Sequence, residues 1–348
     1  MTPADPDPLS PDVRRIVDAM SDAFPDPARA PLSAEALRTA SRAMSSSKTS
    51  KTSRTEPGAG AEAGAGVDRP PRAQSLIVDR LVPGRPPVPV RVYCPEGATL
   101  GGPAVVFLHG GGWVLCDLDT HDGLCRELAV LTGSTVVSVD YRRAPEHRFP
   151  AALLDAYTVI CWAAKRSSRL VVAGDSSGGN LAAAATLMSR DRGGPAPAAQ
   201  LLLYPVLDHR LDRPSATTYA TGFFHTTAHM RWYWEQYLGP DGDGDGPYAS
   251  PGLAPDLSGL PPAYLLLPEC DPLHDEGRAY ATRLAESGVP VELTVVPGMF
   301  HGFLGLRGIL PEADKCLADA ASWLKQHLPA CDTGRPATGG TGSSSSLC

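Results

Sequence analysis

Short uninterrupted runs of apolar residues alternate along most of the chain with longer segments in which apolar residues recur every three or four positions. Runs such as VVFLH, VVSVD and QLLLY are typical of strands that are buried on both faces of a parallel sheet. The periodic segments between them are typical of helices that cover such a sheet. The pattern therefore predicts an α/β fold, in which ligands bind at the carboxyl ends of the strands.

The strands and helices of this region can be placed by residue. Strands are expected at Gln74–Val82, Val88–Tyr93, Ala104–His109, Thr135–Asp140, Leu170–Ala173, Ala199–Leu203, Ala263–Leu267 and Val291–Val296. Helices are expected at Thr120–Leu131, Ala151–Ala164, Gly179–Ser189, Thr226–Tyr237, His274–Ser287 and Ala313–His327.

The amino-terminal segment has a different pattern. Apolar residues at helical spacing predict two short helices, at residues 10–22 and Ser33–Met44. The stretch Ser45–Asp68 has no apolar periodicity and is rich in Ser, Gly and Ala, so we expect a flexible linker there. Residues 331–348 have a similar composition and are expected to form a disordered tail.

Composition limits the function classes. With 348 residues and 43% hydrophobic residues, the chain can form one large α/β domain with a substantial core. A net charge of −7 argues against nucleic acid as a partner, because phosphate binding favours a basic surface. The first residues, MTPADPDPLS, do not resemble a secretory signal, and no apolar run reaches transmembrane length. A cytoplasmic location without stable membrane insertion is therefore expected.

The eight cysteines are scattered and form no C-x-x-C pair, which suggests reduced thiols. Cysteine and histidine residues do not cluster at the spacing that zinc sites need. No metal and no other cofactor is expected.

The sequence GDSSG, from Gly174 to Gly178, lies between a predicted strand and a predicted helix. This is the G-x-S-x-G pattern of a nucleophile elbow, in which glycines permit a turn tight enough to lift the serine into a cleft. Ser176 is the expected nucleophile. The backbone N–H of Ser177, at the start of the helix, is an expected oxyanion donor, whereas its side chain is expected to be passive. The alternative is an ordinary loop between a strand and a helix.

Three consecutive glycines follow the predicted strand at residues 104–109, in the sequence HGGGW. Gly110, Gly111 and Gly112 are expected to turn N–H groups toward an oxyanion, as in lipases and esterases. A phosphate loop is the alternative, but it would need a following lysine or a G-x-G-x-x-G frame. His109 is expected to support the loop with its ring. Trp113 either shapes the substrate pocket or fills the core.

An acid and a base are each found directly after a later strand. Asp271 follows the strand run YLLLPEC, and His301 follows VVPGMF. A serine hydrolase of this fold places its triad in the chain order Ser, Asp, His, so these residues are the expected partners of Ser176. Asp275 is the main alternative acid, although it falls inside a predicted helix.

Six motifs in this order resemble the hormone-sensitive-lipase-like esterases, known in bacteria as family IV: HGGGW, YRRAPEHRFPAA, GDSSGGNLAAAA, YPVLD, DPLHDEGRAYATRL and PGMFHGF. The resemblance covers about residues 74–328. It implies an α/β-hydrolase fold with an eight-stranded, mostly parallel sheet flanked by helices. It also implies Ser176, Asp271 and His301 as the triad and short- to medium-chain esters as substrates. Ser177 replaces the family's more usual Ala.

The resemblance also implies a domain plan. Residues 1–44 would be cap helices, 45–68 a linker, and 69–330 a catalytic domain with a cap insertion at about 212–240. Trp113, Phe223 and Met299 are candidates for lining the substrate pocket. His225 and His229 lie in the predicted cap and could also touch substrate.

Other activities stay open at this stage. The same triad serves deacetylases, amidases, dehydratases and eliminases that act on specialised metabolites, and a non-catalytic binding protein is a remote alternative. The expected partner is a small-molecule acyl ester. The sequence also leaves a homodimer open.

Overall fold

The computed structural model describes residues 7–27, 30–52, 75–99, 101–329 and 347. Within these residues the centre of the fold is an eight-stranded sheet in the order β1-β2-β4-β3-β5-β6-β7-β8. β2 pairs antiparallel with β1 and β4, and every other pair is parallel. The strands are β1 (Leu76–Val82), β2 (Val88–Cys94), β3 (Ala104–Leu108), β4 (Thr135–Val139), β5 (Leu170–Asp175), β6 (Ala199–Leu203), β7 (Ala263–Cys270) and β8 (Val291–Phe300). The predicted fold class is confirmed.

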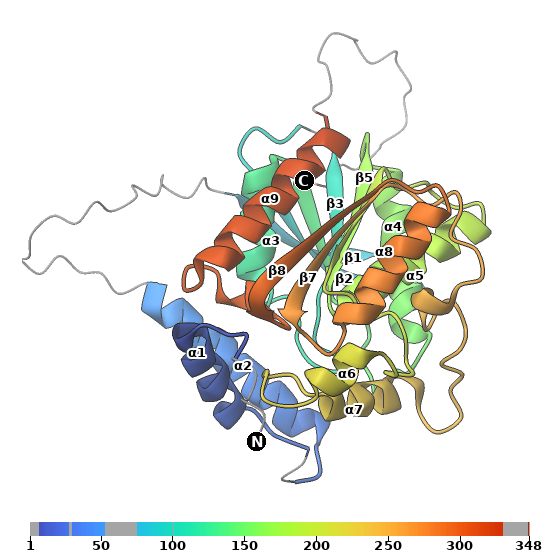
Figure 1. The fold of residues 1–348 in the computed structure, drawn as a ribbon. Helices are drawn as coiled ribbons and strands as arrows, with labels where there is room; N and C mark the ends of the chain where they lie inside the picture. Colours follow the sequence, from blue (N-terminus) through green and yellow to red (C-terminus); the bar gives the residue numbers. More distant parts are fainter. Residues whose placement is uncertain (1–6, 28–29, 53–74, 100, 330–346, 348) are drawn as a thin grey trace, which may run out of the picture.

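Helices cover both faces of the sheet. Helices α3 (Asp122–Thr132) and α9 (Pro311–His327) lie on one face, and α4 (Ala151–Ala164), α5 (Ser177–Asp191) and α8 (His274–Glu286) lie on the other (Figure 1). The covered strands β3, β4, β5 and β6 are buried along their whole length. This double coverage explains why they consist of continuous apolar runs rather than alternating ones.

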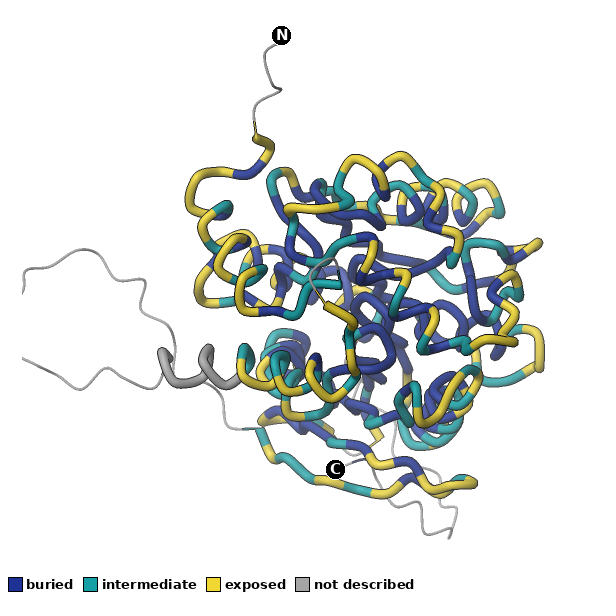
Figure 2. Tube along the Cα trace, turned by 90° about the horizontal axis from the view of Figure 1, so that it is seen from below, coloured by how far each residue is buried: buried dark blue, intermediate teal, exposed yellow. Residues whose placement is uncertain are grey.

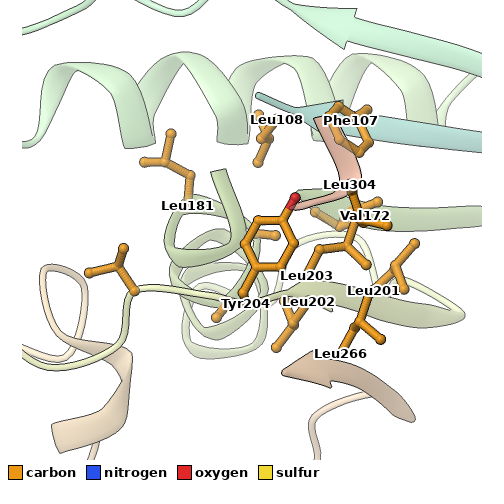
Figure 3. Packing of buried hydrophobic residues seen from close by; sticks show 14 of the residues in the cluster. Phe107, Leu108, Val172, Leu181, Leu201, Leu202, Leu203, Tyr204, Leu266 and Leu304 are labelled. Atoms are coloured by element: carbon orange, nitrogen blue, oxygen red, sulfur yellow. The ribbon is translucent and has the colours of Figure 1, made fainter. Parts of the chain in front are cut away.

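The core continues to the carboxyl end of the sheet. Figure 3 shows the ring of Tyr204, which directly follows β6, packed among leucines of β6 and β7 and Leu304. Tyr204 is 2% exposed and Leu304 is 0% exposed. Buried residues fill the interior, and exposed residues follow the outer helices and loops (Figure 2). The carboxyl end of the sheet is thus supported by a close-packed layer of side chains.

Four helices gather beyond the arrowheads of β7 and β8: α1 (Pro11–Ala23), α2 (Ala34–Thr52), α6 (Pro214–Thr218) and α7 (Thr227–Leu238) (Figure 1). The two halves of this layer are joined, since His229 Nε2 on α7 lies 2.8 Å from the carbonyl oxygen of Pro25. Arg38 on α2 donates to the carbonyl oxygens of Val114 and Ala144, at 2.8 and 3.0 Å. These bonds tie α2 to the loops that follow β3 and β4.

Some boundaries differ from the predicted ones. Helix α2 runs to Thr52, past the predicted end at Met44, and residues 53–68 of the predicted linker lie outside the described residues. Of the predicted tail, only Leu347 is described. The short helix α6 and the 3₁₀ helices η1 (Pro251–Leu253) and η2 (Phe303–Leu306) were not predicted.

The cysteines bring one correction. Cys94 is disulfide-bonded, so the expectation of reduced thiols is wrong at this position. Free thiols are found at Cys116, Cys125, Cys161, Cys270 and Cys316.

None of the described helices is long and apolar enough to cross a membrane.

Candidate active site

The turn between β5 and α5 is very tight. Ser176 adopts φ 53° and ψ −119°, a backbone conformation that is costly for a residue with a side chain. A Cβ on Gly178 would lie 1.9 Å from the carbonyl oxygen of Leu108, and one on Gly174 would lie 2.3 Å from the carbonyl oxygen of Gly178. Both positions therefore require glycine. The Ser176 N–H donates to Leu203 O at 2.8 Å, which holds the turn against β6.

The structure brings Ser176, His301 and Asp271 together in one hydrogen-bonded chain. His301 Nε2 lies 2.9 Å from Ser176 Oγ, and His301 Nδ1 lies 2.8 Å from Asp271 Oδ2. All three side chains are buried. Asp271 Oδ1 also accepts the N–H of Leu273 at 2.9 Å, which fixes the carboxylate at the carboxyl end of β7. The arrangement is that of a nucleophile, a base and an orienting acid.

Asp275, the alternative acid, has a different partner. Its Oδ2 accepts the N–H of Ser215 at 2.8 Å, and the Ser215 hydroxyl donates to Pro272 O at 2.9 Å. Asp275 therefore ties α6 to the start of α8. Its carboxylate is not the one that bonds His301.

Two peptide groups of the glycine loop are held by their carbonyl oxygens. The oxygen of Gly110 lies 2.8 Å from His109 Nδ1, and the oxygen of Gly111 accepts the N–H groups of Val114 and Leu115 at 3.1 and 2.8 Å. In a trans peptide the carbonyl and the next N–H point in opposite directions. Because these two carbonyl oxygens are bonded, the N–H groups of Gly111 and Gly112 point away from the groups that bond them.

The loop is also held at both ends by side chains that flank the nucleophile. The N–H of Gly110 donates to Asp175 Oδ1 at 2.8 Å, and the N–H of Trp113 donates to Ser177 Oγ at 3.1 Å. The N–H of Gly110 is thus already bonded. Three N–H groups have no acceptor among the described residues and are free for an oxyanion: those of Gly111, Gly112 and Ser177.

His109 supports this loop as a neutral ring. Burial, together with the positive charge of His121, lowers the pKa of His109 to about 3. Its ring stacks on Tyr141 with centroids 4.2 Å apart, and the Tyr141 hydroxyl donates to His109 O at 2.7 Å. A neutral ring with its proton on Nδ1 can donate to Gly110 O. His109 is therefore a support for the loop, whereas the ring that contacts Ser176 Oγ is that of His301.

The three residues predicted to line a pocket lie in different surroundings. Trp113 is 1% exposed and stacks on Tyr237 with centroids 4.1 Å apart, so it packs within the aromatic core beneath the cap. Phe223 packs edge-on against Tyr219, and the Arg14 guanidinium lies over its ring. Met299 is buried near the end of β8.

Two residues of α7 and the segment before it approach His301 and the glycine loop more directly. The ring of His225 lies edge-on to that of His301, with centroids 5.5 Å apart. Burial, together with the charges of His301 and His229, lowers the pKa of His225 well below its usual value, so this ring is neutral. The ring of Tyr233 lies against Gly112, where an added Cβ would approach its Cγ to 2.3 Å.

Sequence reasoning missed two residues that contact the site. Tyr204 lies edge-on to His301, with centroids 5.1 Å apart. His121 lies 3.2 Å from Asp175. Tyr204 directly follows a strand, as Asp271 and His301 do, and this position was a usable signal. Among the described residues no group of three or more His, Cys, Asp or Glu side chains could hold a metal ion.

Known proteins resemble this chain in sequence and in structure. A family model described as the alpha/beta hydrolase fold matches residues 105–305. Ethyl acetate hydrolase of Pseudomonas putida is 41% identical over 251 residues, which covers 69% of this chain and 79% of the relative. Carboxylesterase NlhH of Mycobacterium tuberculosis is 41% identical over 254 residues, which covers 70% of this chain and 79% of the relative.

A solved structure extends the likeness beyond these aligned residues. The esterase of Pyrobaculum calidifontis matches with a TM-score of 0.77 at 37% identity, covering 91% of this chain and 98% of that chain. The similarity therefore includes most of the architecture as well as the motifs.

Proposed function

Because the chain belongs to the hormone-sensitive-lipase-like esterases of the α/β-hydrolase fold and is a carboxylic ester hydrolase, we propose that Ser176, Asp271 and His301 are its catalytic triad. The observation that carries the proposal is the continuous chain of hydrogen bonds, 2.9 Å from Ser176 Oγ to His301 and 2.8 Å from His301 to Asp271. The proposed substrates are carboxylic esters of short to medium acyl chain.

In the first half of the reaction, His301 Nε2 takes the proton of Ser176 as Oγ attacks the ester carbonyl carbon. The Asp271 carboxylate keeps the other ring proton on Nδ1 and stabilises the imidazolium that forms. His301 then gives its proton to the leaving alcohol, which leaves an acyl group on Ser176.

The carbonyl oxygen becomes negatively charged during the attack. We assign its stabilisation to the N–H groups of Gly111, Gly112 and Ser177, since these three are free to donate. Donors already held in place need little reorganisation when the charge develops, which is the main source of their catalytic effect. The positive end of the α5 helix dipole adds to this field.

In the second half, water replaces the alcohol. His301 removes a proton from the water, which attacks the acyl carbon, and the same N–H groups stabilise the second tetrahedral intermediate. Protonation of Ser176 by His301 releases the carboxylic acid and restores the free enzyme.

The proposed acyl size rests on the relatives. The relative from Pseudomonas putida is named for hydrolysis of ethyl acetate, an ester with a two-carbon acyl group. The proximity of Tyr233 to Gly112 also favours a narrow acyl group at the loop. A panel of p-nitrophenyl esters of increasing chain length, measured beside matching amides, would define the preference.

The decisive test is Ser176→Ala. The wild type should release p-nitrophenol from the acetate or butyrate ester, and the variant should lose roughly 10⁴-fold or more in kcat. Circular dichroism should show an unchanged fold, and a fluorophosphonate should label the wild type but not the variant. Equal turnover by the two proteins would refute the proposal.

The location and the assembly are separate proposals. The cytoplasmic location and the homodimer are both proposed from the sequence alone. The disulfide at Cys94 weighs against the first, because such bonds are rare in the cytoplasm of mesophiles. Fractionation of the source cells and light scattering of the purified protein would test them.

A further inference from the structure

A second pair of a histidine and a carboxylate lies beneath the glycine loop. His121 Nε2 lies 3.2 Å from Asp175 Oδ1 and 3.4 Å from Oδ2. Asp175 directly precedes the nucleophile, and its Oδ1 is also the acceptor for the N–H of Gly110 at 2.8 Å. One carboxylate therefore connects His121, the nucleophile elbow and the start of the loop.

The hydrogen bonds around His121 hold its ring in place. Its Nδ1 lies 3.0 Å from Thr120 Oγ1, whose hydroxyl donates to Asp117 O at 2.8 Å. Its Nε2 faces the Asp175 carboxylate, which only accepts, so Nε2 carries a hydrogen and donates it to Asp175.

The surroundings favour an ion pair at this place. The Asp175 side chain is 11% exposed and that of His121 is 13% exposed, so an unpaired carboxylate here would be costly. Although burial alone raises the pKa of Asp175, the charge and hydrogen bond of His121 lower it below its usual value. The other titratable groups that face the pair are His109, Cys116, Cys125, Tyr141, Arg143 and Tyr204.

Most of these neighbours carry no charge. Burial lowers the pKa of His109 to about 3 and raises that of Cys116 to about 11 and that of Cys125 to about 12. Burial also raises the pKa values of Tyr141 and Tyr204. His121 is thus the titratable side chain that lies in direct contact with the Asp175 carboxylate.

We propose that His121 is a positioning residue for ester hydrolysis: its ring holds the Asp175 carboxylate, which in turn holds Gly110 and keeps the oxyanion donors aligned with Ser176. The inference rests on the proposed function of the loop. Its distinctive consequence is kinetic. Misaligned donors stabilise the transition state less but leave ground-state binding unchanged, so kcat falls and KM does not.

The test uses His121→Gln, which removes the ring but keeps a donor of similar reach. With kcat normalised to active sites titrated in the burst of p-nitrophenol, we expect a loss of about 10- to 100-fold and a KM within twofold of wild type. Asp175→Asn should give a loss of similar size. The double variant should lose little more than either single variant, because both break the same link.

Two further measurements separate positioning from a general structural role. An alkyl trifluoromethyl ketone forms an oxyanion on the nucleophile, so its inhibition constant should rise by the factor by which kcat/KM falls. The inhibition constant of the carboxylic acid product should not change. His327→Gln is the matched control, because His327 lies on α9 and bonds only Trp323 O, at 3.1 Å. It should keep the wild-type kcat.

Nitrogen NMR of the wild type tests the inference without any variant. Nε2 of His121 should show the shift of a ring nitrogen that carries a hydrogen. A ring with its hydrogen on Nδ1 alone, a normal kcat in His121→Gln, or a purely additive double variant would each overturn the inference. These results would leave the proposed function intact, since that is tested by Ser176→Ala alone.

Discussion

The N–H of Trp113 donates a hydrogen bond of 3.1 Å to the hydroxyl of Ser177, the residue that follows the nucleophile. The sequence suggested that this hydroxyl is passive. In the structure it fixes the far end of the glycine loop.

Ser177→Ala should therefore slow the enzyme without inactivating it. Loss of one hydrogen bond of roughly 1 kcal/mol predicts about a fivefold lower kcat on p-nitrophenyl butyrate. The control is Ser189→Ala, which removes another buried hydroxyl from α5 that bonds Pro195 O. This control should lose stability but keep its kcat. A Ser177→Ala enzyme as fast as wild type would show that the loop does not need this bond.

Asp271→Asn should lower kcat by about 10⁴, because an amide in place of the carboxylate favours the wrong tautomer of His301. Asp275→Asn is the matched control. Asp275 bonds Ser215 rather than His301, and an asparagine oxygen can keep that bond. Steady-state kinetics with one ester should find near wild-type activity in the control. The opposite ranking would make Asp275 the catalytic acid.

Gly112→Ala should lower kcat by about 10² to 10³, the usual effect of losing one oxyanion donor. Gly112 has φ 59°, and a Cβ there would lie 2.3 Å from Tyr233 Cγ, so the loop must move. Gly133→Ala tests the backbone strain alone, since Gly133 has φ 67° and nothing within 4 Å of an added Cβ. This control should lose stability only, as thermal unfolding and kinetics can show together.

Glu276→Gln should stabilise the protein at neutral pH. Burial, reinforced by the charges of Asp208 and Asp271, raises the pKa of Glu276 well above its usual value. The stability contributed by this group is complete below the unfolded-state pKa of about 4.3 and is lost as pH rises through the folded-state pKa. A neutral glutamine avoids that loss and can still accept the N–H of Leu207, now 2.7 Å from the carboxylate.

Thermal melts at pH 4 and pH 7 would check this. Tm of the variant should exceed that of wild type at pH 7, by roughly 2–4 °C for each kcal/mol gained, and the gain should vanish near pH 4. Glu286→Gln, which changes an exposed glutamate of the same helix, should behave like wild type at both values. A gain of equal size at both pH values would contradict the role of ionisation.

Much of the fold could be predicted because local pattern and burial agree. The central strands are continuous apolar runs since they are covered on both faces. The predicted boundaries were wrong where the tertiary structure overrode the local preference of the residues. The last strand was predicted to end at Val296, but β8 continues through Pro297 and Gly298 to Phe300, past an irregularity opposite Pro268 and Cys270. The polar stretch after Met44 suggested a linker, although α2 continues as far as Thr52.

In the candidate site, too, some residues could be predicted from the sequence and others could not. Ser176, Asp271 and His301 could be found because each follows a strand, and parallel strands end at one edge. Their supports could not, because the bond between Gly110 and Asp175 joins residues 65 positions apart. The pairing of His121 with Asp175 likewise depends on how α3 packs. Such contacts belong to the tertiary structure and leave no periodic signal in the sequence.

The contact between Tyr233 and Gly112 has a consequence for substrate selection. We expect an acyl group too wide for the space beside Tyr233 to displace α7, and α7 packs against the same peptide whose N–H we propose as an oxyanion donor. A wide acyl group would then be excluded by its size and would lose stabilisation of its oxyanion at the same time. A bulky ester would be discriminated against in turnover rather than in binding, and it would act as a poorly processed competitor of smaller esters.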